Sequence, residues 1–289
     1  MKDNKHDPTR KFALIGYPLS HTMSPPIHDR LFALSGFGGE CEYNVIEVPT
    51  DELATFSSVL RDLSGYNVTI PHKVSIINAL DGLDPLAKRY GAVNCVKNGE
   101  KSIGYNTDVV GFLRTIRALG ASLESDVLML GCGGVGRMMA IETALCGGNI
   151  TIAVRQSDLE SASALKDDIL CLSPNTSVNI TTLDKIDGSY DLLINATPVG
   201  MYPHGNDMPI EADVLKRVRF LFDAIYNPVQ TKLIKSAIKH GVSTIGGMSM
   251  LVWQAAAAHE IWNDAQFDIQ DIDALIKRME NTVDKEFGQ

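Results

Sequence analysis

The feature that most restricts the possible folds is a glycine-rich segment that follows an apolar run without a break. The run 126–130 is read as a strand, and the next residues are Gly131-Cys132-Gly133-Gly134-Val135-Gly136, followed by a helical pattern to about Cys146. In this setting Gly131 permits a tight turn, Gly133 lets the backbone approach a pyrophosphate, and the helix offers its free N–H groups to that anion. The pattern predicts a dinucleotide site at Gly131, Gly133, Gly134, Val135 and Gly136. Glycines that serve packing alone are the alternative.

Apolar runs alternate with amphipathic stretches along the whole chain, which is typical of βαβ units. We predict an α/β fold of two domains, an N-terminal α/β substrate domain and a Rossmann-type doubly wound domain. Their expected bounds are 1–106 with 247–289 for the first and 107–246 for the second. In the first domain we expect strands at 12–17, 42–48 and 66–70, helices at 25–34, from Thr50, at 72–80 and at 84–90, and a hairpin of 93–97 with 101–105.

Length and composition agree with a two-domain protein and exclude several classes. The chain has 289 residues, 45% of them hydrophobic and 21% charged, and a net charge of −9. This acidic balance argues against nucleic acid or anionic lipid as a partner. Five scattered cysteines without CxxC spacing predict neither disulfides nor a metal site. No signal peptide or membrane-spanning run is apparent, so a cytoplasmic protein is expected.

The choice of dinucleotide depends on the end of the second strand of the glycine-loop domain. An NAD enzyme usually carries Asp or Glu there, about 20 residues after the glycines. This chain instead has Arg155 after the strand 150–154. A guanidinium suits a ribose 2′-phosphate, so NADP is favoured and NAD is kept as an alternative. A solvated surface arginine is the other interpretation, and Asp158, three residues on, can compete for the same guanidinium.

Two reactive side chains lie near predicted helix starts in or beside the first domain. Lys73 ends the segment Asn67-Val68-Thr69-Ile70-Pro71-His72-Lys73, where a helix dipole would lower its pKa and favour proton exchange. Asp108 ends Gly104-Tyr105-Asn106-Thr107-Asp108 and is expected in the first turn of the next helix. Taken alone, Asp108 is explained as well by the preference for acids at helix starts. His21 and His72 flank these segments and are interpreted as packing or helix-start residues.

Eight segments in order resemble the shikimate dehydrogenase family, from Phe12 to Trp262. They are GYPLSHTMSP (16–25), NVTIPHK (67–73), GAVN (91–94), YNTD (105–108), GCGGVG (131–136), INATPVGM (194–201), DAIYNPVQT (223–231) and GGMSMLVWQ (246–254). The resemblance implies reversible NADP-linked reduction of 3-dehydroshikimate to shikimate in aromatic amino acid biosynthesis. It also implies that the C-terminal helices return to the first domain.

The resemblance assigns roles to particular positions. Lys73 and Asp108 correspond to the catalytic pair, Lys73 exchanging a proton with the substrate oxygen while Asp108 holds the hydroxyl and orients Lys73. Positions implied to bind substrate are Thr22, Ser24, Asn67, Thr69, Asn94, Tyr226 and Gln254. Positions implied to line the nicotinamide half of the cofactor site are Asn195, Thr197, Gly200, Met201, Ile225 and Gly247.

Three departures from the family pattern leave alternatives open. Thr22 replaces a serine, Cys95 replaces a common threonine, and Arg155 lies between Val154 and Gln156 instead of in Asn-Arg-Thr or Asn-Arg-Ser. A quinate/shikimate dehydrogenase with NAD or dual cofactor use is therefore a second hypothesis. A non-catalytic nucleotide sensor is a third, because a fold alone does not fix function. The expected partners are a small-molecule substrate and, at most, a second copy of the chain, as a monomer or homodimer.

Overall fold

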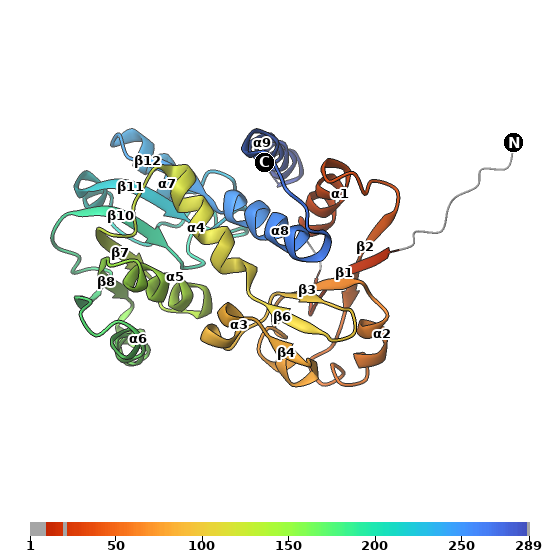
Figure 1. Ribbon diagram of the computed structural model, residues 1–289. Coiled ribbons are helices and arrows are strands. Elements are labelled where there is room, and N and C mark those ends of the chain that lie inside the picture. Colours follow the sequence, from red (N-terminus) through yellow and green to blue (C-terminus); the bar gives the residue numbers. More distant parts are fainter. Residues whose placement is uncertain (1–9, 20–21, 288–289) are drawn as a thin grey trace, which may run out of the picture. The chain divides into compact units, whose positions relative to one another are not determined.

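The computed structural model describes residues 10–19 and 22–287, which form two compact units (Figure 1). The first unit runs to Gly111 and includes Val252–Met279, and the second comprises Phe112–Leu251 and the chain from Glu280. The bounds predicted for the two functional domains stay a proposal. Among the described residues, no helix has both the length and the apolar character needed to cross a membrane.

The first unit is built on a mixed sheet in the order β2-β1-β3-β5-β6-β4. β1 (Arg10–Gly16) pairs in parallel with β2 (Cys41–Glu47) and β3 (Gly65–Val68), whereas β5 (Cys95–Lys97) is antiparallel to β3 and β6 (Ile103–Tyr105). The predicted hairpin across Asn98-Gly99 is therefore confirmed. β4 (Gly82–Leu83) closes the edge beside β6.

Helices cover both faces of this sheet. The strand residues Ala13, Ile15 and Val68 pack with Leu60 of α2 (Ser57–Arg61) and Ala87 of α3 (Pro85–Tyr90). On the other face Phe12 and Leu14 pack with Phe32 of α1 (Ser24–Leu34) and Trp262 of α8 (Gly247–Asn263). The Trp262 indole also donates to the Val96 carbonyl at 2.9 Å. The predicted return of the C-terminal chain to the first sheet is thus confirmed; α9 (Ile269–Phe287) follows α8.

The helix predicted from Thr50 is wrong. Residues 50–56 form successive turns, and α2 begins only at Ser57. Short-range hydrogen bonds close these turns, from Thr55 N to Glu52 O at 2.9 Å and from Ser57 N to Ala54 O at 3.3 Å. These bonds reach back three residues, as in turns, and only the bond from Phe56 N to Glu52 O at 3.3 Å reaches back four, as in an α-helix.

The second unit contains a parallel sheet in the order β12-β11-β10-β7-β8-β9. In chain order within the unit this is 6-5-4-1-2-3, the doubly wound Rossmann order, so the predicted fold class is confirmed. The strands are β7 (Asp126–Leu130), β8 (Asn149–Val154), β9 (Val178–Thr182), β10 (Tyr190–Asn195), β11 (Val218–Asp223) and β12 (Ser243–Gly246). The sheet reverses direction of growth between β7 and β10, which is where such sheets bind ligands.

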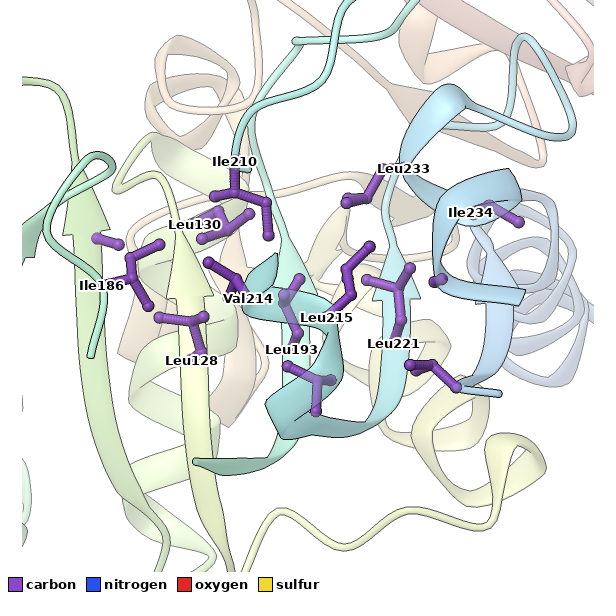
Figure 2. Close-up of a cluster of buried hydrophobic side chains, with 14 residues drawn as sticks. Leu128, Leu130, Ile186, Leu193, Ile210, Val214, Leu215, Leu221, Leu233 and Ile234 are labelled. Carbon is purple, nitrogen blue, oxygen red and sulfur yellow. The ribbon is translucent and has the colours of Figure 1, made fainter. Parts of the chain in front are cut away.

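The helices of the second unit lie on both sides of its sheet. On one side Leu128, Leu193 and Leu221 pack with Leu215 of η3 (Ala212–Arg217) and Leu233 of α7 (Lys232–Lys239), as Figure 2 shows. On the other side Phe112 of α4 (Thr107–Leu119) contacts Phe222, which alternates with Leu221 on β11. The remaining helices are α5 (Gly134–Leu145), η2 (Gln156–Asp158) and α6 (Leu159–Leu172).

A pair of fully buried histidines lies in the first unit, in addition to the fully buried His72. His28 Nδ1 of α1 lies 3.0 Å from His259 Nε2 of α8. Burial lowers the pKa of both, that of His259 to about 3, with a further contribution from the Arg10 guanidinium. In the unfolded chain these two histidines bind a proton near their ordinary pKa of 6.5. Their contribution to folding stability should therefore be complete above this pH and decline as the pH falls towards about 3.

We expect His259→Gln to reduce the acid sensitivity of folding. Each proton bound only by the unfolded chain contributes a slope of about 1.4 kcal/mol per pH unit, so the variant should lose roughly one such contribution. Urea unfolding between about pH 7.5 and about pH 5 measures the slope. His240→Gln, at an exposed histidine, controls for removing a histidine as such. An identical slope in wild type and His259→Gln would contradict this explanation.

Candidate active site

The reactive pair predicted in the first unit is an ion pair in the structure. Lys73 Nζ lies 2.7 Å from Asp108 Oδ2. Asp108 occupies the first turn of α4, where the helix dipole favours a carboxylate. The exposed fractions of the two side chains are 28% and 17%, so both are constrained yet still accessible to a small ligand.

Lys73 itself does not begin a helix, which corrects the sequence prediction. Residues 71–74 form a turn, and only a short 3-10 helix, η1 (Ser75–Ala79), follows it. The proposed effect of a helix dipole on Lys73 therefore loses its basis. Its backbone is held instead by Val93 N, which donates to the Lys73 carbonyl at 2.7 Å. The neighbouring His72 is fully buried with Nε2 2.6 Å from the Val48 carbonyl, as a packing role requires.

Asn94 links the ion pair to the sheet. Its Nδ2 donates to Asp108 Oδ1 at 2.9 Å, and its Oδ1 accepts from the Thr107 backbone N–H at 2.7 Å. Both carboxylate oxygens of Asp108 thus have a donor, Lys73 on one side and Asn94 on the other. Asn94 is only 3% exposed. Its amide is therefore well placed to orient Asp108, besides the substrate contact that the family resemblance implies.

The other predicted positions of the first unit lie around this pair. Asn67, buried near the end of β3, donates from Nδ2 to the Asn94 carbonyl at 3.2 Å. Gln254 Oε1 accepts from Asn94 Nδ2 at 3.3 Å. Thr22 Oγ1 accepts from the Ser24 N–H at 3.2 Å, which leaves the Thr22 hydroxyl proton for another acceptor. Thr69 is half-buried just after β3, whereas His21 lies outside the described residues.

The glycine loop of the second unit has the geometry of an anion site. Gly131 has φ of +89°, a left-handed conformation that other residues rarely adopt. A Cβ on Gly136 would lie 3.0 Å from the Gly131 carbonyl oxygen, so a larger residue there would require the backbone to shift. Gly133 and Gly134 have open space around their Cα atoms, and no side chain caps the start of α5. The exposed helix N–H groups, together with Val135, fit a pyrophosphate.

A buried polar cluster holds the ends of β10 and β11. Asn195 is fully buried; its Nδ2 donates to Asp223 Oδ1 at 2.9 Å and its Oδ1 accepts from the Thr197 hydroxyl at 2.7 Å. Thr231 Oγ1 donates to Asp223 Oδ2 at 2.6 Å. Burial raises the pKa of Asp223, and these hydrogen bonds oppose that rise. Asn195 is therefore placed to shape the loop that carries Thr197.

The arginine predicted to bind a 2′-phosphate is paired within the protein. Arg155 Nε lies 2.7 Å from Asp158 Oδ2, and its Nη2 lies 3.3 Å from Asp158 Oδ1. The hydrogen bond from Arg155 lowers the pKa of the Asp158 carboxyl. The Arg155 side chain is 74% exposed, so a phosphate can reach it only in competition with this carboxylate. The competition expected from the sequence is present.

The remaining predicted positions of the second unit differ in exposure. Met201 is exposed, Tyr226 is half-buried, and Ile225 is buried. Gly247 follows β12 directly, its N–H donating to the Ile225 carbonyl at 3.0 Å, and a Cβ there would clash with the Ala224 carbonyl. Gly200 has φ of +97°, so this turn too depends on glycine.

Comparison with known proteins identifies the family. Residues 14–96 match the family model described as the shikimate dehydrogenase substrate binding domain. A shikimate dehydrogenase (NADP(+)) of Methanococcus maripaludis is 38% identical to the chain over 276 residues, which cover 93% of this chain and 95% of that protein. The chain belongs to the shikimate dehydrogenase family. The resemblance carried by the eight motifs is thereby confirmed.

Solved structures of similar shikimate dehydrogenases share the fold. Shikimate 5-dehydrogenase from Thermus thermophilus, in complex with NADP(H) and shikimate, is 30% identical with a TM-score of 0.81, covering 93% of this chain and 99% of that one. The enzyme from Listeria monocytogenes, in complex with shikimate and NAD, is 29% identical with a TM-score of 0.84, covering 96% and 99%.

Three residues that support the candidate site were not predicted from the sequence. Thr107 contributes its N–H to Asn94, and Asp223 and Thr231 form the cluster under Asn195. Thr107 and Thr231 lie at helix starts, where hydroxyl residues are common, so a capping signal was available. Asp223 ends an apolar strand, and a carboxylate at that position was the signal that could have found it.

We expect Thr231→Val to destabilise the second unit. The Thr231 hydroxyl donates to Asp223 and accepts from Ile234 N–H at 3.1 Å as the N-cap of α7. Valine keeps the shape but leaves both buried partners unpaired, so the free energy of unfolding should fall by about 3 kcal/mol. Urea unfolding followed by circular dichroism measures this. Thr231→Ser keeps the hydroxyl and should recover most of the loss; equal stability of the two variants would refute the explanation.

Proposed function

We propose that the chain is a shikimate dehydrogenase that reversibly reduces 3-dehydroshikimate to shikimate with NADP, a reaction of aromatic amino acid biosynthesis. The observation that carries this proposal is the Lys73–Asp108 ion pair, with Asn94 on the second carboxylate oxygen. A family member without redox function would have no use for an ammonium held at a carboxylate in an accessible site. We also propose a cytoplasmic location and a monomeric or homodimeric state.

Lys73 moves the proton at the substrate oxygen. In the direction of reduction its ammonium donates to the developing alkoxide, and in the direction of oxidation its amine accepts the hydroxyl proton. Asp108 accepts a hydrogen bond from the same hydroxyl and keeps Lys73 directed at it. Because Asn94 donates to Asp108 Oδ1, the carboxylate cannot rotate freely away from Lys73. The pair therefore keeps its orientation between turnovers.

Neutral polar groups recognise the rest of the substrate. Thr22, Ser24 and Tyr226 supply hydroxyls for the carboxylate, and Asn67, Thr69 and Gln254 supply partners for ring hydroxyls. A polyhydroxylated ligand requires such a set, because each buried polar group left unpaired costs about 1–3 kcal/mol.

The second unit holds NADP through three sets of residues. The exposed N–H groups from Gly133 to Val135 bind the pyrophosphate. Arg155 binds the ribose phosphate once its ion pair with Asp158 has opened. Asn195, Thr197, Gly200, Met201, Ile225 and Gly247 shape the nicotinamide half of the site. When bound, NADPH would supply the hydride for reduction, and NADP(+) would accept it in oxidation.

Lys73→Ala should abolish shikimate oxidation while NADP binding is retained. Loss of general acid–base catalysis reduces kcat by about 100- to 10,000-fold, whereas the glycine loop is untouched. Steady-state kinetics with shikimate and fluorescence titration with NADPH measure the two quantities. Lys101→Ala, at an exposed lysine of the same unit, is the matched control. Near-normal kcat in Lys73→Ala would remove Lys73 from the mechanism.

The Arg155–Asp158 pair and Thr22 also favour a second candidate, a quinate/shikimate dehydrogenase with NAD or dual cofactor use. Catalytic efficiencies for shikimate and quinate, each with NADP and NAD, separate the two. A strong preference for shikimate with NADP excludes the second candidate, and comparable efficiencies for all four pairs exclude the first.

Asp158→Ala should lower the KM for NADP, because it frees the Arg155 guanidinium for the 2′-phosphate. Arg155→Ala should raise the KM for NADP about tenfold or more and leave the KM for NAD nearly unchanged, since NAD has no 2′-phosphate. Initial rates with each cofactor at saturating shikimate provide the values. If Arg155→Ala raised the KM for NADP and for NAD equally, Arg155 would not bind the 2′-phosphate.

A further inference from the structure

Tyr43 lies on β2 and contacts one of the proposed substrate residues, although no sequence motif includes it. Its hydroxyl donates to Asn67 Oδ1 at 2.8 Å. Tyr43 therefore supports a position that we assign to substrate binding.

These contacts determine what the Asn67 amide can offer a ligand. Oδ1 is used by Tyr43, and one Nδ2 proton is used by the Asn94 carbonyl at 3.2 Å. A flipped amide would place its oxygen against that carbonyl and lose this bond, and Tyr43 would then have to accept from Nδ2 instead of donating to Oδ1. The second Nδ2 proton is left for the substrate, whereas Oδ1 already accepts from Tyr43, so we expect Asn67 to offer the substrate a donor.

The Tyr43 ring is prevented from leaving this position. It is 7% exposed and stacks on the His28 ring at a centroid distance of 4.0 Å with an interplanar angle of 8°. His28 is in turn held by its contact with His259. Burial raises the pKa of Tyr43 well above its ordinary value, so the phenol keeps its proton at any pH at which the enzyme works.

We propose that Tyr43 is a positioning residue that fixes Asn67 as a hydrogen-bond donor, so that the substrate hydroxyl at Asn67 is recognised as an acceptor. The inference rests on the proposed shikimate dehydrogenase function. Tyr43 touches no substrate atom; it acts through Asn67. Removing its hydroxyl leaves a buried amide oxygen unpaired, which favours other orientations of Asn67 and weakens ground-state and transition-state binding alike.

A double-mutant cycle of Tyr43→Phe and Asn67→Ala tests this route. Tyr43→Phe should raise the KM for shikimate about tenfold, with kcat within about twofold and the KM for NADP unchanged. Asn67→Ala should also raise the shikimate KM. In the double variant, Tyr43→Phe should add almost nothing, because its target is already absent.

Tyr66→Phe is the matched control. Tyr66 precedes Asn67 on β3 and is equally buried, but its side chain lies in the core on the other face of the sheet. Loss of the Tyr66 hydroxyl should leave the KM for shikimate unchanged. Additive effects of Tyr43→Phe and Asn67→Ala, or an unchanged KM in Tyr43→Phe, would overturn the inference while leaving the enzyme function intact. Wild-type protein that neither binds nor oxidises shikimate would instead overturn the proposed function itself.

Asn67→Asp tests, without changing Tyr43, whether residue 67 must donate a hydrogen bond to the substrate. The carboxylate keeps an acceptor for the Tyr43 hydroxyl but replaces the N–H donor by a second acceptor. We expect the shikimate KM to rise at least as much as in Asn67→Ala. Wild-type affinity in Asn67→Asp would show that Asn67 does not serve as a donor and would overturn the inference even if Tyr43→Phe failed to fold.

Discussion

The site in the first unit depends on the requirement that Asp108 keep a donor on each carboxylate oxygen. Lys73 supplies one and Asn94 the other, and Asn94 is itself held by the Thr107 N–H. A half-buried carboxylate with an unused oxygen would be costly and free to turn. The remaining polar side chains extend outward from Asn94 through Asn67 to Tyr43. The hydrogen bonds of Asp108 are thus linked, through Asn94 and Asn67, to Tyr43 on β2.

The second unit uses a different constraint, the close approach of backbone at the ends of parallel strands. Gly131 and Gly136 permit the turn into α5, and Gly247 permits the turn after β12. The buried carboxylate of Asp223 ties β10, β11 and α7 together through Asn195 and Thr231. The first unit brings Lys73 and Asp108 together, whereas the second mainly exposes backbone N–H groups of the kind that bind anions.

Much of the fold could be predicted because its signals are local. The helix predicted over 84–90 is present as α3, and Asp84 caps its start by accepting from Ala87 N at 2.7 Å. Asn98-Gly99 predicted the hairpin. The segments 50–56 and 71–74 were predicted as helical from local signals, but their backbone forms turns, because the packing of the surrounding chain can override local helix preference.

By itself the sequence determined the Rossmann-type domain, the glycine turn, and Lys73 and Asp108 as the candidate pair, since strand periodicity, left-handed glycine turns and family motifs are properties of short segments. Only the tertiary structure decided which atoms meet: that Asn94 faces Asp108, that Asp158 occupies Arg155, and that Tyr43 reaches Asn67. The physical reason is that hydrogen-bond partners separated by many residues are chosen by how strands align and helices pack, and a one-residue shift in a strand turns each side chain to the opposite face.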